Sequence, residues 1–527
     1  MSDLNAAPRH LLAISLCAAL AACAGDDNST SESSTAATDS TTSASSVEAS
    51  TAGPSSTGSA TTESTVTSST ASSDSTASTS DPTVEPTTST SSSTTTESST
   101  TSGDVEPIDW NRGFINNSTL TVDQVAVGPD GAVAIAGYHF GATDFGDGQL
   151  EAEGFFDMYL VLFDAAGELL WQRALSTGIT PKATDTMQIG VSVASDGDIV
   201  LTGPFETPTD FGSGPLTPDD ATDAFVARYA PDGELRWVTA LRGPGMDIGT
   251  HAIVDANGDT IATGGFEVTL EAGETLTNVD PERQDIYLVK LDGDGVPLWA
   301  QSFGTSLGEH GHELAVAPDG DIILHAEAYG SLDLGGGEVE IPCCQWSDFV
   351  ARYTSDGVFK WATVLGASSQ YVEPDGLAVA PDGSIYAISA EFDLSKLSPD
   401  GALQWSHALA GVASYGVAAR PEGGVWITGH VHDEAAIDFG DGVPETVAAR
   451  SATLVAYDAG GAVVDKRFFQ GLDDGEPRGM PGYGIAIGDD GSVITTYGVD
   501  FTTFVTADFG LGDVQGAGFL VHRAPGF

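Results

Sequence analysis

The sequence predicts an all-β protein: a seven-bladed β-propeller in residues 104–527, preceded by a signal peptide and a disordered linker. A pattern of four short apolar runs recurs seven times. The seventh copy lacks its fourth run, and a matching run stands ahead of the first copy instead. Self-similar units of about this length, each with four strands, are typical of propeller blades arranged in a ring.

Residues 1–22 have the features of a lipoprotein signal peptide. Arg9 and His10 precede the apolar stretch 11–22, which is too short to span a bilayer comfortably, and Cys23 follows Leu-Ala-Ala. This order resembles a bacterial lipobox, in which the cysteine is diacylated and becomes the new N-terminus. The resemblance implies a lipid anchor at Cys23 in the cell envelope. Because no aspartate follows Cys23 directly, it also implies the outer membrane or cell surface. The alternative is an ordinary secretory signal with an incidental cysteine.

Residues 23–103 form the expected linker. From position 28 onward this segment consists almost entirely of Ser, Thr and Ala, with scattered acidic residues and no Lys or Arg. Such a composition cannot bury enough apolar surface to offset the entropy of ordering the chain. We therefore expect a disordered tether between the lipidated N-terminus and the propeller.

Each repeat opens with an apolar run that ends in a tight glycine turn. Glycine supplies the positive φ that a short hairpin requires, so Asp-Gly and Asn-Gly are strong hairpin signals. A second apolar run follows each turn, which predicts two antiparallel strands. The turn glycines are spaced by 66, 61, 62, 63, 40 and 68 residues, and they are Gly131, Gly197, Gly258, Gly320, Gly383, Gly423 and Gly491.

The second half of each repeat predicts two further strands. The third run usually begins with aspartate, as at Asp157, Asp223 and Asp285. A second turn with glycine follows, and the fourth run carries a tryptophan four residues after that glycine. The sixth repeat departs from the pattern, with Asp465 at the tryptophan position. The tryptophans are Trp171, Trp237, Trp299, Trp361 and Trp405.

The two ends of the repeat region predict how the ring closes. The seventh repeat ends with its third run at 518–523, whereas Trp110 and Phe114 ahead of the first repeat keep the spacing of a fourth run. We therefore expect the N-terminal strand to complete the last blade, which leaves only short edges for aggregation. The alternative is an open array or a stacked solenoid, in which such a displaced strand has no purpose.

The charge of the chain restricts its partners. There are 76 acidic and 18 basic residues, a formal net charge of −58. Nucleic acids and anionic membrane surfaces are disfavoured because both require a cationic surface. Cations, cationic polymers and basic protein patches are electrostatically permitted, although the acidity alone can serve solubility. We expect a monomer attached to the membrane only through its N-terminal lipid.

Strand order predicts which face of the propeller binds. The first-to-second and third-to-fourth connections are tight turns on the bottom face, and the longer, varied connections emerge on the top face, where binding sites are more common. The fifth repeat lacks its second-to-third loop, which predicts a notch beside the fourth repeat. Cys343, Cys344 and Trp346 stand there as candidate ligand contacts. The two cysteines are open to two interpretations, a vicinal disulfide or buried thiols.

The same loops carry a recurring Asp-Phe-Gly or Asp-Leu-Gly motif. Its recurrence favours a structural role, with a buried apolar anchor and an Asp-Gly turn, over a repeated calcium site. The motifs begin at Asp144, Asp210, Asp333, Asp438 and Asp508.

A second candidate site is the mouth of the central channel. Seven and eight residues before the turn glycines, where the first strands begin, several repeats carry carboxylate, amide or imidazole groups. Such groups converging on an axis could hold a cation, with calcium as the candidate; alternatively they only solvate the channel. These candidates are Asp123, Gln124, His251, His312, Glu313 and Asp375. No phosphate-binding glycine loop, nucleophile elbow or paired Cys-x-x-Cys motif occurs.

The repeat, with its Asp-Gly turn, its third run beginning with aspartate and its Gly-x-x-x-Trp spacing, resembles bacterial β-propeller repeats of the SBBP type over nearly all of 107–523. The resemblance implies a surface or secreted propeller and no defined activity. We therefore expect a noncatalytic scaffold that binds a protein or glycan through its top-face loops.

An enzyme is the alternative function. The segment 164–171 is similar to the tryptophan-docking motif of pyrroloquinoline-quinone dehydrogenases, in some of which a vicinal disulfide packs on the quinone and calcium lies at the channel. That family has eight blades and a cationic residue at the quinone, which this sequence does not match. The resemblance of segment 164–171 to this motif implies a quinone- and calcium-dependent dehydrogenase.

Overall fold

The computed structural model describes residues 109–116, 118–154, 156–179, 189–219, 222–341, 345–368, 376–389, 392–409, 411–431, 435–473, 476–499 and 505–526. The regular elements in these ranges are all β-strands, and none is a helix, which confirms the all-β class. No helix long and apolar enough to cross a membrane is found in the part of the chain that is described. The predicted leader, Cys23, the linker, Cys343, Cys344 and Asp375 lie outside the described residues.

The main sheets each contain four antiparallel strands that follow one another in the chain. The first is β3 (Gln124–Val127), β4 (Val133–Phe140), β7 (Asp157–Phe163) and β8 (Leu169–Leu175), with β2 (Thr119–Leu120) also on β4. The next three are β9 (Gly190–Val193), β10 (Ile199–Phe205), β13 (Asp223–Tyr229), β14 (Leu235–Leu241); β15 (Ile248–Val254), β16 (Thr260–Phe266), β19 (Asp285–Leu291), β20 (Pro297–Phe303); and β21 (Glu309–Val316), β22 (Ile322–Ala328), β25 (Trp346–Tyr353), β26 (Phe359–Ser368).

The second half of the chain continues the pattern. The fifth and sixth sheets are β27 (Leu377–Val379), β28 (Ile385–Ile388), β29 (Leu394–Leu397), β30 (Leu403–His407); and β31 (Val412–Ala419), β32 (Val425–Val431), β35 (Ala452–Tyr457), β36 (Val463–Phe469). The last sheet joins β39 (Gly482–Ile487), β40 (Val493–Gly498) and β43 (Gly518–Arg523) to β1 (Trp110–Asn116), and continues into β5 (Ala142–Asp144) and β6 (Gln149–Glu151).

Small hairpins occupy the second-to-third connections of the repeats, the fifth excepted. In the fifth repeat β28 ends at Ile388 and β29 begins at Leu394, so the connection is short, as the spacing of the turn glycines predicted. The hairpins are β11 (Thr209–Asp210)/β12 (Pro215–Leu216), β17 (Thr269–Glu271)/β18 (Thr275–Thr277), β23 (Leu332–Asp333)/β24 (Glu338–Val339), β33 (Ala435–Ile437)/β34 (Glu445–Val447) and β41 (Val505–Asp508)/β42 (Asp513–Gly516), the last extended by β37 (Gly471–Asp473) and β38 (Glu476–Arg478).

The recurring Asp-Phe-Gly motif builds these hairpins. In β11, the Asp210 Oδ1 atom accepts hydrogen bonds from the backbone N–H groups of Gly212 (2.8 Å) and Gly214 (2.9 Å). Phe211, between Asp210 and Gly212 in the sequence, is fully buried, and its ring centre lies 4.5 Å from that of Phe225. The motif is therefore an Asx turn with an apolar anchor, which confirms the structural interpretation.

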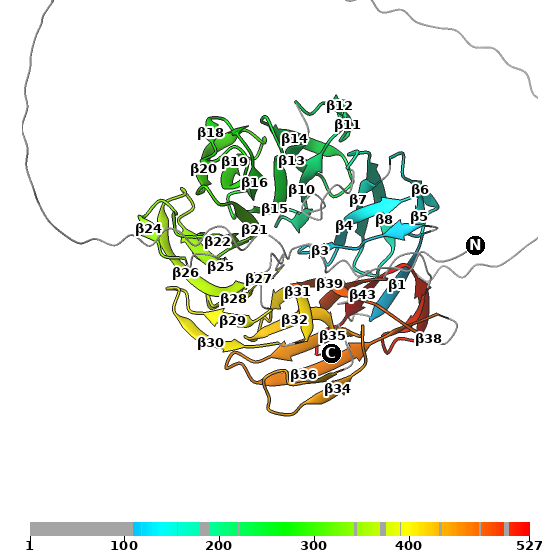
Figure 1. Ribbon diagram of the computed structural model, residues 1–527. Coiled ribbons are helices and arrows are strands. Elements are labelled where there is room, and N and C mark those ends of the chain that lie inside the picture. The colour runs from blue at the N-terminus through cyan, green and yellow to red at the C-terminus, as the bar shows by residue number, and fades with distance from the viewer. Residues whose placement is uncertain are drawn as a thin grey trace, which may run out of the picture. The chain divides into compact units, whose positions relative to one another are not determined.

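The sheets of residues 109–526 are arranged around a common centre (Figure 1). The first strand of each sheet lies nearest the centre, and the fourth strand lies at the outside (Figure 1). Neighbouring first strands contact one another in chain order, β3 with β9 and so on to β39, and β39 in turn contacts β3. The apolar core lies between adjacent sheets; for example, Leu160 and Leu201 from the first two sheets share one buried cluster.

The N-terminal strand pairs with the C-terminal strand. β1 runs antiparallel to β43, with Trp110 opposite His522 and Phe114 opposite Gly518. Two further contacts extend this pairing. The carboxylate of Asp109 accepts hydrogen bonds from the Arg523 guanidinium (3.1 Å) and from the Ala524 N–H (2.7 Å). The strand pairing and these side-chain contacts thus join segments more than 400 residues apart.

The Gly-x-x-x-Trp spacing serves contacts between sheets. The Trp237 indole Nε1 donates a hydrogen bond to the Gly293 carbonyl (2.9 Å) in the next sheet's turn, and its ring lies over Gly295, where a Cβ atom would come within 2.5 Å. Glycine leaves room for the ring and adopts the required φ of 79°. Two residues later, Thr239 donates to the Gly295 carbonyl (2.7 Å). Indole bonds of this kind also join Trp110 to Ala165, Trp171 to Pro231 and Trp405 to Ala459.

These contacts explain why the sixth repeat has Asp465 instead of tryptophan. The sheet that follows it is closed by β43 and β1, which come from distant parts of the chain and are not joined by a turn. A tryptophan at position 465 would therefore meet no turn that joins the third and fourth strands of that sheet. Asp465 instead forms an ion pair with Arg467 (2.9 Å).

Candidate functional site

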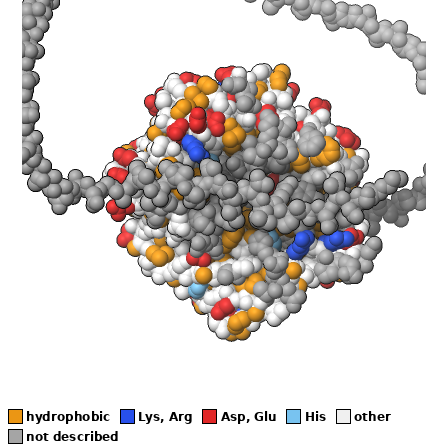
Figure 2. Space-filling model, viewed as in Figure 1, with side chains coloured by type: hydrophobic (Ala, Val, Ile, Leu, Met, Phe, Trp, Pro, Cys, Tyr) orange, Lys and Arg blue, Asp and Glu red, His pale blue; other side chains and the backbone are white. Residues whose placement is uncertain are grey.

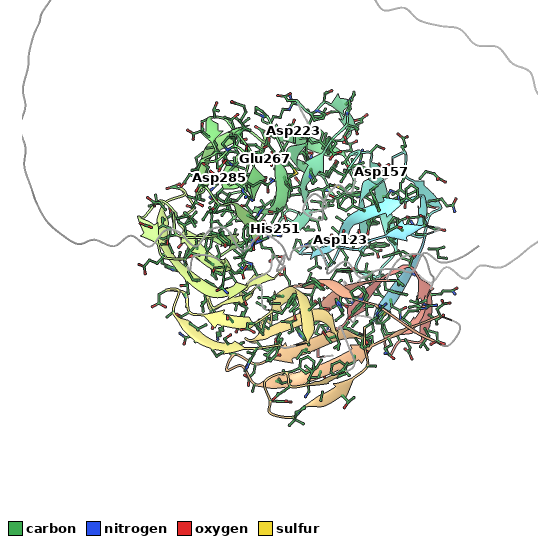
Figure 3. The ribbon with its side chains drawn as sticks, viewed as in Figure 1. Asp123, Asp157, Asp223, His251, Glu267 and Asp285 are labelled. Carbon is green, nitrogen blue, oxygen red and sulfur yellow. The ribbon has the colours of Figure 1, made fainter. Side chains whose placement is uncertain are left out.

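Of the predicted channel-mouth residues that the structure describes, Gln124, His251, His312 and Glu313 lie on innermost strands, and Asp123 directly precedes β3. Figure 3 places Asp123 and His251 toward the centre of the ring, whereas Asp157, Asp223 and Asp285 lie further out. Gln124 begins β3 and Glu313 lies in β21.

The environment of these residues changes their proton affinity. Desolvation raises the pKa of Asp123 to about 7, against a hydrogen bond of 2.6 Å from the Thr121 hydroxyl that lowers it. Desolvation likewise raises the pKa of Glu313 to about 8. It lowers the pKa of His251 to about 4, and the neutral ring accepts a hydrogen bond from the Leu314 N–H (3.2 Å) at Nδ1. His251 is therefore a structural residue that links two inner strands.

Trp346 belongs to a group of aromatic side chains at the top face of the fourth repeat. Its ring centre lies 5.6 Å from that of His310 and 5.7 Å from that of Tyr329, the latter edge to face. We call His310, Tyr329 and Trp346 the aromatic group. All three are half-buried, and Leu307 nearby is 44% exposed.

A second group lies deeper in the same sheet and is buried. It consists of His312, His325, Glu327 and Asp348, which we call the histidine–carboxylate group. His325 and Glu327 are two residues apart in β22 and so share one face of the sheet, and Asp348 in β25 pairs directly with Glu327. His312 comes from an irregularity in β21, where Gly311 pairs with Ala326 and Glu313 with His325, which leaves His312 as an extra, unpaired residue.

The distances in this group are short but exceed those of hydrogen bonds. His312 Nε2 lies 3.7 Å from Glu327 Oε1, and His325 Nε2 lies 4.0 Å from Asp348 Oδ1. These four side chains are at most 1% exposed. One ligand atom each from His312, Glu327 and Asp348 lies within 4.8 Å of the others, and among the described residues this is the set of three whose spacing suits a metal ion.

Both imidazoles of the group are neutral at ordinary pH. Burial lowers the pKa of His312 to about 4. Burial, and then the nearby His312, lowers the pKa of His325 to about 3. The ring nitrogens of these two histidines have no hydrogen-bond partner within the described ranges. A neutral imidazole nitrogen is a good ligand for a transition metal.

Comparison with the other repeats shows which of these residues are particular to the fourth. Five residues after the turn glycine, where the fourth repeat has His325, the second, third and sixth repeats have a threonine whose hydroxyl donates to a carbonyl of the third strand. His312 stands where the third repeat has Thr250, and Glu327 where it has Gly265. Asp348 lies one residue beyond the recurring aspartate position of the third strand, because it pairs with Glu327 as Ile286 pairs with Gly265, whereas Asp285 pairs with Phe266.

The sequence pattern predicted His312 as a site residue, but as part of a channel-mouth site. It did not predict His325, Glu327 or Asp348. The available signal was the replacement of a recurring threonine by histidine, two residues before a glutamate. Of the predicted candidates that are described, the structure brings His312 into the histidine–carboxylate group and Trp346 into the aromatic group above it.

A surface groove lies away from both the aromatic group and the histidine–carboxylate group. It has a volume of about 560 Å³ and lies between the turns of the sixth and seventh repeats, on the face opposite the aromatic group. Its lining includes Arg420, Trp426 and Asp490, and the guanidinium of Arg420 lies 6.0 Å from the Trp426 ring centre.

Comparisons with known proteins give distant similarities. No family model matches the chain. The regulatory protein FlaEY of Caulobacter vibrioides is 29% identical over 185 residues, which are 33% of this chain and 18% of FlaEY, so the matched segment spans under a fifth of that protein.

Among solved structures, BamB from Moraxella catarrhalis aligns with a TM-score of 0.38 and 11% identity, covering 79% of this chain and all of BamB. A protein of unknown function from Bacteroides caccae gives 0.31 and 12%, covering 51% of this chain and 78% of its own. A luciferin-regenerating enzyme gives 0.32 and 13%, covering 64% and 92%. No family assignment follows from these similarities.

Proposed function

We propose that this chain is a cell-envelope lipoprotein, anchored through Cys23, that displays a monomeric, noncatalytic seven-bladed propeller and binds a protein or glycan at its top face. The leader and the Ser/Thr-rich linker support the location, since a lipid anchor followed by a tether would hold the folded part away from the membrane.

The arrangement of the sheets supports the propeller. Seven four-stranded units follow from the repeat, and contacts between neighbouring first strands run from β3 to β39 and back to β3. Pairing of β1 with β43 supplies the fourth strand of the last unit. In this interpretation, β1 closes the ring without a covalent link.

The observation that carries the binding proposal is the aromatic group. His310, Tyr329 and Trp346 come from three of the four positions where strands of the fourth repeat reach the top face. Aromatic rings offer flat apolar faces for sugar rings or for apolar anchors of a protein partner, together with polar atoms at their edges. The exposed Leu307 adjoins them.

The charge of the surface favours cationic or neutral partners. Asp and Glu side chains are spread around the edge of the face seen in Figure 2. With a net charge of −58, the chain would repel phosphate backbones, so a nucleic acid is not the proposed ligand.

The quinone-enzyme alternative has less support. Its main basis was the spacing of glycine and tryptophan, and the tryptophans at these positions pack against the neighbouring sheet's turn, a role that needs no cofactor. We therefore favour binding over catalysis.

The test combines localisation and binding on the full chain. Cys23→Ser should abolish labelling with a fatty-acid analogue and release the protein from the membrane fraction. Trp346→Ala should weaken binding to an immobilised panel of envelope polysaccharides and surface proteins at least tenfold, since it removes the centre of the aromatic group.

The matched control for binding is Phe140→Ala, which removes a 36% exposed aromatic side chain from the top of the first repeat. Equal binding by the wild type and Trp346→Ala would reject the aromatic group as the site. Membrane retention of Cys23→Ser would reject the lipid anchor.

A further inference from the structure

We propose that His312, His325, Glu327 and Asp348 form a binding site for a divalent transition-metal ion, with Zn²⁺ as the metal to test first. The site lies inside the sheet of the fourth repeat. It is independent of the proposed function and does not require the top face to bind any partner.

The geometry suits an ion at the centre of the group. Ligands of a tetrahedral zinc ion lie about 2.0–2.2 Å from the metal and therefore about 3.4 Å from one another. The observed separations of 3.7 Å (His312 to Glu327) and 4.0 Å (His325 to Asp348) exceed this value by less than 1 Å. They are too long for direct hydrogen bonds. Small side-chain rotations would bring the ligand atoms of His312, Glu327 and Asp348, which lie within 4.8 Å of one another, to one ion. A further rotation of His325, whose Nε2 lies 4.0 Å from Asp348 Oδ1, would supply the fourth ligand.

The donor atoms select the class of metal. Two neutral imidazoles and two carboxylates match the ligands of zinc and of neighbouring divalent metals such as Co²⁺, Ni²⁺ and Mn²⁺. Calcium takes six to eight oxygen ligands, and two imidazoles in a set of four do not meet that requirement. A calcium ion is therefore not expected at this group.

The burial of the two imidazoles also supports a metal ion at this site. His312 and His325 are at most 3% exposed, and their ring nitrogens have no hydrogen-bond partner within the described part of the chain. A buried polar atom without a partner is costly, so such an atom points to an ion or another group that satisfies it. An ion between them would satisfy one nitrogen of each ring and would offset the negative charge of buried carboxylates.

The repeat shows that the group is not required by the fold. At the positions of His312, His325 and Glu327 the third repeat has Thr250, Thr263 and Gly265, and it forms the same four-stranded sheet. Thr250 and Thr263 satisfy their hydroxyls with backbone carbonyls, at 2.8 Å for each. The fourth repeat has replaced a self-contained hydrogen-bond arrangement by four metal-binding side chains.

The arrangement points to a structural ion. With His325 as the fourth ligand, protein side chains would fill all four positions of a tetrahedral site, which leaves none open for a substrate. The ligands come from β21, β22 and β25, so an ion would link the first three strands of the sheet. Residues of the aromatic group lie two positions away along these strands, at His310, Tyr329 and Trp346. Metal binding would stabilise the part of the sheet on which that group stands.

The experiment uses the full chain, stripped of metal with a chelator and then dialysed against Zn²⁺. We expect one tightly held zinc ion per chain by elemental analysis, and a thermal unfolding midpoint several degrees higher with Zn²⁺ than without, because the ion binds the folded state. Ca²⁺ and Mg²⁺ at the same concentration should give no comparable rise. Co²⁺ should give the visible absorption of a four-coordinate site.

Two variants test the ligands without threatening the fold. His325→Thr and His312→Thr copy residues that the third repeat already carries in an intact sheet. Each should lose the tight zinc ion, the thermal shift and the Co²⁺ absorption. His139→Gln is the matched control, since it removes a fully buried imidazole from the first sheet and should retain all three.

Two results would overturn the proposal. One is a wild-type chain that holds no zinc against a chelator. The other is a His325→Thr, His312→Thr double variant, folded by circular dichroism, that holds as much zinc as the wild type.

Discussion

The indole Nε1 of Trp110 donates a hydrogen bond to the carbonyl oxygen of Ala165, 3.0 Å away in the turn between β7 and β8. Its ring lies against Gly167, and Arg112 donates to the Gly167 carbonyl at 2.7 Å. The N-terminal strand is therefore fastened on two sides, by strand pairing to β43 and by this tryptophan contact to the first sheet. It repeats the contact between sheets that Trp171, Trp237 and Trp405 make.

Replacement of Trp110 should destabilise the folded protein. Full burial makes a Trp→Ala change cost about 3–5 kcal/mol, and because Trp110 is half-buried we expect about 2–3 kcal/mol in the free energy of unfolding. Urea unfolding followed by circular dichroism measures it. Trp110→Phe, which keeps an aromatic ring but loses the hydrogen bond, should lose less. A Trp110→Ala chain as stable as the wild type would show that β1 is not needed to hold the ring.

Gly295 should resist substitution more than Gly258, although both are turn glycines with a positive φ. Alanine at 295 would place its Cβ 2.5 Å from the Trp237 ring and would adopt a φ of 79°. Gly258 has a φ of 85° but no atom within 4 Å of its Cβ position, so Gly258→Ala isolates the backbone cost of about 1–2 kcal/mol. We expect Gly295→Ala to lose at least about 1 kcal/mol more than Gly258→Ala in urea unfolding. Equal losses would mean that the Trp237 indole shifts away from the new Cβ atom without cost.

Asp465→Trp restores the repeat pattern but should not stabilise the protein. The sheet that follows has no third-to-fourth turn to receive the indole, and the change removes the ion pair with Arg467. We expect the free energy of unfolding to stay equal or to fall by up to about 1 kcal/mol. An increase in stability would show that another surface accepts the tryptophan.

Asp247 should make stability depend on pH. Burial, and then the nearby Asp223 and Glu267, raises the pKa of Asp247 to about 9 from an ordinary value of 3.8. The folded state therefore holds this proton more tightly than the unfolded state, so stability falls as the pH rises from about 4 toward 9. Asp247→Asn should reduce that fall, measured as the thermal midpoint between pH 5 and pH 9.

Asp210 provides the control with the opposite sign. The N–H groups of Gly212 and then Gly214 lower the pKa of Asp210, so its contribution is present above its ordinary pKa and is lost as the pH falls through its folded pKa. Asp210→Asn should therefore leave the profile between pH 5 and pH 9 unchanged in slope. If Asp247→Asn also leaves the slope unchanged, Asp247 is not the group responsible.

The local sequence was enough to predict the class of fold and most of the strands. A glycine turn flanked by apolar runs forms a hairpin through short-range backbone preferences, so Gly131 and its six equivalents marked the repeats without reference to the rest of the chain. The Asp-Phe-Gly turns were predictable for the same reason, because Asp210 and Gly212 are two residues apart. The lipid anchor at Cys23 and the number of blades stay predictions from the sequence.

What depends on contacts between distant segments was decided by the tertiary structure. His312 was visible as a polar residue, but an irregularity in β21 separated it from Glu313 and brought it to Glu327, which faces Asp348 across a strand pair. Asp465 departs from the repeat because of a sheet formed by the two ends of the described chain. Strand propensity acts over a few neighbouring residues, whereas the register of pairing sets which side chains meet, and that register is fixed only when the sheets pack together.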